Sequence, residues 1–115
     1  SLKSWNGPGF NHLAPLLEAS KKFSERMMLK GKTASEWVAW GFRCATARIP
    51  EAEELEILMD GYRKRLALYL ENPQAAEQLL SQGESKVAAQ LPKAQLAALT
   101  TVASVILNLD EVINK

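Results

Sequence analysis

The residues of this chain that could take part in chemistry are few and stand far apart in the sequence. Its 115 residues include one histidine, His12, and one cysteine, Cys44. A general base needs a positioned substrate group beside it, and a zinc site needs three or four ligands. We therefore expect His12 to be a solvated or capping side chain and Cys44 to be a small buried hydrophobic residue. One cysteine also excludes a disulfide within the chain.

Five other polar residues are the plausible donors if this chain completed an enzyme site formed mainly upstream: Glu36, Arg43, Arg48, Glu54 and Asp110. That hypothesis requires their side chains to converge on one pocket. The group formed by Arg48, Glu53 and Glu54 has a simpler explanation, because one helix ends there and the next begins with acidic residues. We predict no catalytic, cofactor-binding or metal-binding residue in this chain.

Two basic runs could contact nucleic acid, namely Lys21-Lys22 and Arg63-Lys64-Arg65. The chain has 14 basic and 13 acidic residues, so its formal net charge is only +1. A domain with so little net charge has no overall field that attracts a polyanion. We interpret Arg63-Lys64-Arg65 as a solvated helix face and expect no nucleic-acid partner.

Several aromatic and amide side chains could contact a ligand but suit the core or the surface better. Trp37 and Trp40 are three residues apart, and their neighbours are apolar around most of the helix, so we expect both to fill the core. Trp5 lies in a glycine-rich segment and is expected to fold onto the helices. Asn108 and Asp110 lie in an apolar context, so each should bond to the backbone or stay near the surface.

The elements that carry these residues are all helical, because apolar residues recur at three- and four-residue steps almost throughout. The pattern predicts an all-α fold, a compact bundle of about five helices at approximately 15–29, 34–47, 50–71, 73–81 and 93–113. Residues 1–14 would form an N-terminal loop and 15–115 a single helical domain. The helix at 34–47 is apolar around most of its circumference, so we expect it to be the central one.

No stretch approaches the roughly 18 apolar residues that span a bilayer, so we expect no direct membrane insertion. The first 30 residues also lack the charged and then apolar layout of a signal peptide. Because the chain begins with Ser1, we expect it to be a piece of a longer protein.

Four short motifs follow one another: Ala45-Thr46-Ala47-Arg48-Ile49-Pro50 with Glu53-Glu54-Leu55, then Glu71-Asn72-Pro73, then Gly83-Glu84-Ser85, then Val102-Ala103 and Leu107-Asn108-Leu109-Asp110-Glu111. In order and spacing they resemble the C-terminal part of the planctomycete-type domain of unknown function, over roughly Pro15 to Lys115. That family has Ala-Leu-Gly-Arg where this chain has Ala45 to Arg48, so Ala47 replaces a glycine.

The resemblance implies a C-terminal helical module of a large, exported, multidomain bacterial protein with an extracytoplasmic location. Such proteins often carry cytochrome-c-like haem domains upstream. This chain has no Cys-x-x-Cys-His motif, so any haem would be attached elsewhere in the parent protein. We therefore expect a noncatalytic helical module that packs against neighbouring domains or a protein partner, with the enzyme fragment as the alternative.

Overall fold

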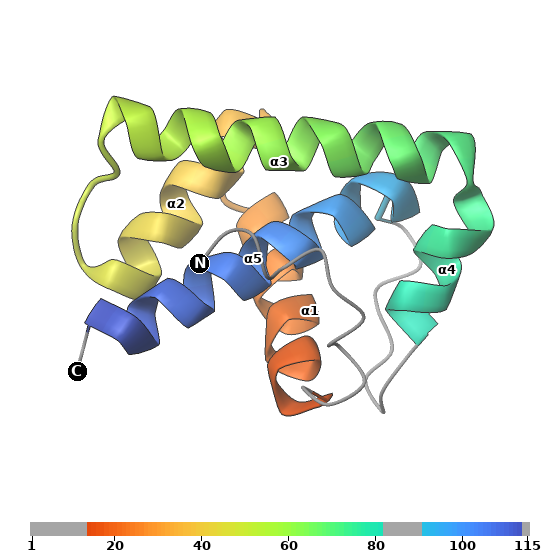
Figure 1. The fold of residues 1–115 in the computed structure, drawn as a ribbon, viewed down its shortest axis with the longest axis horizontal. Helices are drawn as coiled ribbons and strands as arrows, with labels where there is room; N and C mark the ends of the chain where they lie inside the picture. Colours follow the sequence, from red (N-terminus) through yellow and green to blue (C-terminus); the bar gives the residue numbers. More distant parts are fainter. Residues whose placement is uncertain (1–13, 82–90, 114–115) are drawn as a thin grey trace.

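The helical bundle predicted from the sequence is confirmed by a computed structural model that describes residues 14–81 and 91–113 (Figure 1). Within these residues the chain forms five α-helices and no strand: α1 (Ala14–Met28), α2 (Ala34–Thr46), α3 (Ala52–Glu71), α4 (Pro73–Ser81) and α5 (Lys93–Ile113). Trp5, His12 and the motif Gly83-Glu84-Ser85 lie outside the described residues, as does nearly all of the predicted loop 1–14.

Helix α5 is the central element, and our expectation that the helix at 34–47 would be central is wrong. Helix α5 packs against each of the other four helices, and every residue from Leu96 to Ile106 is buried. By contrast, Glu36, Arg43 and Cys44 on α2 are exposed. In Figure 1, α3 runs along one side of α5 while α1 and α2 lie on others.

Small side chains explain why α5 can be surrounded. The small residues of its buried stretch are Ala97, Ala98, Thr100, Thr101, Ala103 and Ser104. Small side chains let neighbouring helices approach closely, with a short distance between the helix axes. The buried hydroxyls are satisfied by their own helix, since Thr101 Oγ1 donates to the Ala98 carbonyl and Ser104 Oγ to the Thr101 carbonyl, both at 2.7 Å.

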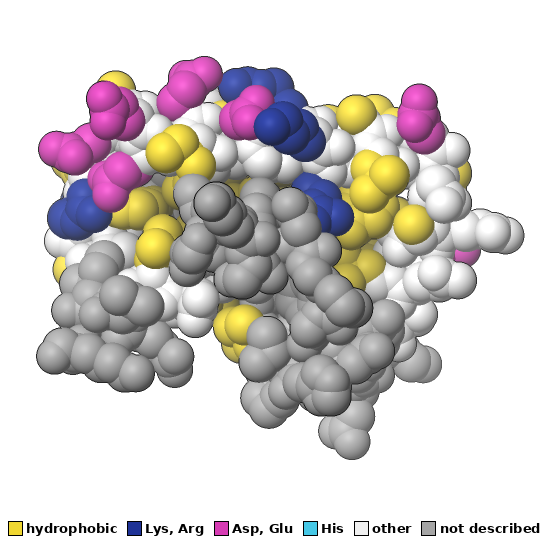
Figure 2. Space-filling model, viewed as in Figure 1, with side chains coloured by type: hydrophobic (Ala, Val, Ile, Leu, Met, Phe, Trp, Pro, Cys, Tyr) yellow, Lys and Arg dark blue, Asp and Glu magenta, His cyan; other side chains and the backbone are white. Residues whose placement is uncertain are grey.

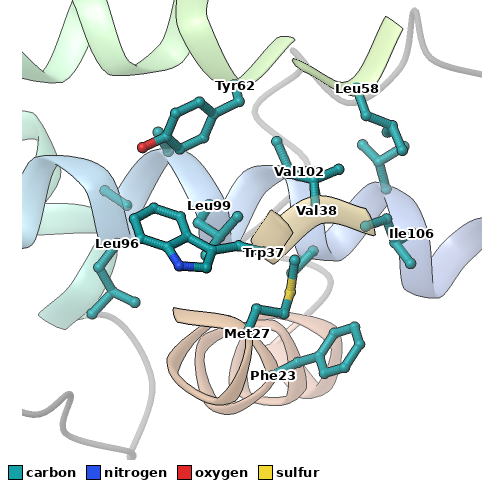
Figure 3. Packing of buried hydrophobic residues seen from close by; sticks show 14 of the residues in the cluster. Phe23, Met27, Trp37, Val38, Leu58, Tyr62, Leu96, Leu99, Val102 and Ile106 are labelled. Atoms are coloured by element: carbon teal, nitrogen blue, oxygen red, sulfur yellow. The ribbon is translucent and has the colours of Figure 1, made fainter. Parts of the chain in front are cut away.

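The large apolar side chains of the other helices converge on α5 (Figure 3). Trp37 packs edge-on against Tyr62 at 6.4 Å between ring centroids, and its indole N–H donates to the Gly31 carbonyl at 2.8 Å. Helix α2 also approaches α1 closely at Gly41, where an added Cβ would lie 2.6 Å from Met27 Cε. The expected core position of Trp37 is thereby confirmed.

A lysine is enclosed within this core. Lys21 on α1 is fully buried, with its ammonium 3.3 Å from the Leu80 carbonyl and 3.3 Å from a carboxylate oxygen of Glu18. Leu80 belongs to the last turn of α4, where carbonyls lack helical partners and a cation is favoured. The Lys21 side chain therefore ties the C-terminal end of α4 to α1.

Reversing the charge at position 21 should destabilise the fold far more than the same change next to it. Lys21→Glu would bury a carboxylate beside a carbonyl oxygen and Glu18, so we expect the free energy of unfolding to fall by about 3–5 kcal/mol. Lys22→Glu changes an exposed residue and should cost no more than about 0.5 kcal/mol. Urea unfolding followed by circular dichroism measures both values. Equal losses in the two variants would show that Lys21 is not enclosed.

Candidate functional site

The polar residues singled out in the sequence are brought together mainly at the connection between α2 and α3. Arg48 forms a two-pronged ion pair with Glu54, with nitrogen–oxygen distances of 2.8 and 2.7 Å. The Arg48 guanidinium also lies 4.9 Å from the centroid of the Phe42 ring. Glu53 is exposed and takes no part in the pair. Arg48 thus links the end of α2 to the start of α3.

The carboxylate of Glu54 also holds the first turn of α3, because the Glu51 backbone N–H donates to it at 2.9 Å. The hydrogen bonds from Arg48 and from this N–H lower the pKa of Glu54 to about 2, and they strengthen when the carboxylate is ionised. Helix α3 accordingly begins at Ala52, two residues later than the predicted 50, with Glu51 as its cap.

The backbone between these helices turns at Ala47, which has φ 63° and ψ 20°. This left-handed conformation brings its N–H to the Arg43 carbonyl at 2.9 Å and ends α2. Among the described residues, Ala47 is the one non-glycine residue with positive φ. A glycine would adopt this conformation without the Cβ clash that alanine suffers.

Glu36 lies at the opposite end of α2 and acts as the reciprocal member of its capping box. The backbone N–H groups of Lys32 and Thr33 donate to its carboxylate at 2.7 and 3.1 Å, and Thr33 Oγ1 accepts from the Glu36 N–H at 3.3 Å. The bonds from these two backbone groups, that of Lys32 first, lower the pKa of Glu36. This confirms the predicted cap at the start of the helix.

The five donors required by the enzyme-fragment hypothesis therefore do not form one group. Glu36 lies in the first turn of α2 and Arg48 follows the end of that helix, which separates them by about 18 Å at the usual helical rise. Arg43 is exposed on the last turn of the same helix. The side chain of Asp110 lies outside the described residues. Of the four donors whose side chains the structure describes, Arg48 and Glu54 are the two in contact.

Trp40 is placed differently from Trp37, at the edge of the contact between α1 and α2. It is half-buried, with its ring centroid 5.8 Å from that of Phe23. Two cations also approach the ring: the guanidinium carbon of Arg26 on α1 at 5.7 Å and the ammonium of Lys30, just after α1, at 5.6 Å from its centroid. Both distances suit cation–π attraction. Trp40 therefore packs against the core with one side and meets the surface with the other.

Two further sequence predictions fare differently in the structure. Cys44 is exposed, so its expected burial is wrong. The inward side of α2 is occupied by Trp37, Val38, Gly41 and Phe42, and Cys44 falls outside that stripe. Asn108 is exposed near the end of α5, which agrees with the surface position that we allowed for it.

The basic run on α3 is engaged with nearby carboxylates. Lys64 pairs with Asp60 at 3.0 Å and Arg63 with Glu56 at 3.5 Å, and all four side chains are largely exposed. This agrees with the solvated face expected for Arg63-Lys64-Arg65. Within residues 14–81 and 91–113, no three histidine, cysteine or carboxylate residues could hold a metal ion. None of the helices in this part of the chain is both long and apolar enough to cross a membrane.

Glycine at position 47 should stabilise the protein. Ala47→Gly removes the Cβ clash of the left-handed conformation, and we expect the free energy of unfolding to rise by about 1 kcal/mol. The matched control Ala45→Gly places glycine inside α2 and should lower that free energy by about 1 kcal/mol. Thermal or urea denaturation of the two variants tests this. A loss of stability in Ala47→Gly would contradict the turn geometry.

The Arg48–Glu54 pair should make stability depend on pH in acid. The folded pKa of Glu54 lies below the ordinary value of 4.5, so its contribution is present above that value and is lost as the pH falls towards 2. We expect Glu54→Gln to have a lower melting temperature than the parent at pH 6, with the difference shrinking by pH 2. Glu53→Gln should follow the parent at every pH. A constant gap between parent and Glu54→Gln would refute the assignment.

Comparison of the chain with protein-family models, with curated proteins and with solved structures gave no match. The structure itself shows an all-α bundle with α5 at its centre. Membership of the family that the motifs resemble stays a prediction.

Proposed function

We propose that this chain is a noncatalytic helical module that docks against neighbouring domains or a protein partner within a larger exported bacterial protein. The observation that carries the proposal is a set of large aliphatic side chains that the bundle leaves facing outward: Leu29, Ile49, Ile57, Leu68 and Leu70. Burying such a side chain against a partner contributes roughly 1.5–3 kcal/mol, which supplies a driving force for docking.

Part of this set forms a defined surface on α3. Ile57 and Leu68 are 50% and 46% exposed, and their spacing of eleven residues is about three helical turns, which places both on one flank of α3. Figure 2 shows hydrophobic side chains gathered beside α3 and α4 on the right of the view. Exposed apolar side chains that share one flank favour an interaction surface over isolated surface residues.

The placement of the polar residues also favours docking over catalysis. Glu36 caps α2, while Arg48 and Glu54 fasten α2 to α3. These side chains are engaged in holding the fold together, and they lie at separate ends of α2. A reaction would need them to converge on a substrate. The enzyme-fragment alternative therefore has no observation in its favour.

The wider context of the proposal comes from the family resemblance, which implies an exported parent protein, an extracytoplasmic location and haem held by other domains. One structural observation supports it. The family pattern carries glycine where this chain has Ala47, and Ala47 adopts the left-handed backbone conformation that favours glycine. We propose no nucleic-acid partner and no cofactor bound by this chain.

Site-specific photo-crosslinking tests the docking function in cells that produce the parent protein. A benzophenone amino acid at position 57 or 68 should give crosslinks that map to one defined segment of the parent or of one partner, because these side chains would be covered. The same probe at Glu77, which is exposed on α4, serves as the matched control and should give none. Equal crosslinking at all three positions, or none at 57 and 68, would overturn the proposal.

A further inference from the structure

Charge is divided unevenly between the two halves of the described chain. Residues 14–46, which include α1 and α2, contain six basic and three acidic side chains, whereas residues 47–81, which include α3 and α4, contain four basic and seven acidic ones. Figure 2 shows the acidic side chains gathered over the N-terminal half of α3, at the upper left. A chain with almost no net charge thus carries a basic half and an acidic half.

The cations of the two halves also differ in their partners. On α3 to α5 and the connection before α3, Arg48, Arg63, Lys64 and Lys93 each pair with a carboxylate in the described structure. On and around α1 and α2, the exposed cations are Lys22, Arg26, Lys30, Lys32 and Arg43. None of these five has an ion-pair partner among the described residues. Among the described residues, α1, α2 and their flanks therefore present five exposed cations that no carboxylate pairs with.

These cations are combined with apolar side chains. Lys22 and Arg26 are four residues apart, which sets them about one turn apart on the outward side of α1, and Lys30 follows two residues after the end of that helix. Leu29, 77% exposed, lies between the last two, and Trp40 receives Arg26 and Lys30 over its ring. We call Lys22, Arg26, Leu29, Lys30, Trp40 and Arg43 the basic α1–α2 surface.

We propose that the basic α1–α2 surface binds an acidic amphipathic segment of a protein, one that offers carboxylates and aliphatic side chains on the same side. The inference rests on the proposed docking function and names the chemistry of a partner for it. Charge complementarity selects the partner and speeds its association, while the exposed Leu29 supplies apolar contact. Guanidinium and ammonium groups both donate to carboxylates, and Arg26 can do so in a two-pronged manner.

Other polyanions fit this surface less well. Single-stranded nucleic acid binds by stacking its bases on aromatic rings, and the ring of Trp40 is already packed against Phe23 and approached by two cations. An anionic membrane surface requires a broad apolar face, and among the described residues from α1 to the end of α2, Leu29 is the one large aliphatic side chain that is strongly exposed. A peptide needs only the mixed pattern that the surface provides.

The test measures binding of the 115-residue chain to a fluorescent helical peptide that carries glutamate and leucine on one side. We expect binding that is lost when glutamine replaces the glutamates. The double variant Arg26→Glu/Lys30→Glu should weaken it at least about tenfold, whereas Arg63→Glu/Lys64→Glu, with the same change of net charge, should weaken it less than about threefold. Lys22→Glu/Arg43→Glu leaves the contacts over Trp40 intact and should also weaken binding about tenfold. Circular dichroism checks that each variant is folded.

Four outcomes would overturn this inference. The first is no binding of the acidic peptide, and the second is an equal loss of peptide affinity in the α1–α2 and α3 variants. The third is tighter binding of the chain to phosphatidylserine vesicles or to single-stranded DNA of equal charge. The fourth is self-association, in which the acidic side of α3 in a second copy occupies the basic α1–α2 surface. Crosslinks from positions 57 and 68 without peptide binding would leave the docking function standing and refute only this surface. Peptide binding without those crosslinks would overturn the docking function proposed above and leave the basic α1–α2 surface as a binding site of its own.

Discussion

The constraint on which the rest of the structure depends is that α5 passes through the middle of the bundle and is buried on all sides. From Leu96 to Ile106 every residue is buried, and the stretch combines large aliphatic with small side chains. The small ones bring neighbouring helices close, and the large ones fill the space between them (Figure 3). Polar side chains are also paired within this interior, since Ser24 Oγ of α1 lies 3.0 Å from Thr100 Oγ1 of α5.

Within this arrangement, the polar residues considered as donors for a reaction hold the helices together. Glu36 closes one end of α2, the Arg48–Glu54 pair fastens its other end to α3, and Lys21 joins α1 to α4. Each of these interactions either satisfies backbone groups at a helix end or holds two helices together. Aliphatic side chains and exposed cations face outward, and this surface is the part of the molecule for which we propose a function.

The sequence predicts the helices well because their ends carry local signals. Thr33 and Glu36 form the capping box, Asn72-Pro73 separates α3 from α4, and each predicted boundary lies within two residues of the observed one. Which helix is central was predicted wrongly, since apolar content was weighed above side-chain size. The absence of any charged residue between Lys93 and Asp110 would have identified α5.

Other features depend on contacts between distant parts of the chain and could not be predicted. The partner of Lys21 is the Leu80 carbonyl, 59 residues further along, and no local pattern links the two. Whether Trp40 faces the core or the surface depends on the angle at which α1 crosses α2. The separation of the enzyme-fragment donors follows from the helix that holds Glu36 and Arg48 apart.

Native-state hydrogen exchange tests the central position of α5 most directly. If α5 is surrounded by all four other helices, its amides from Leu96 to Ile106 open only when the whole domain unfolds, so they should be the slowest to exchange. The amides of α4, which has few buried residues, should exchange earlier through local opening. Amides of α5 that exchange as fast as those of α4, while α2 stays protected, would contradict a bundle built around α5.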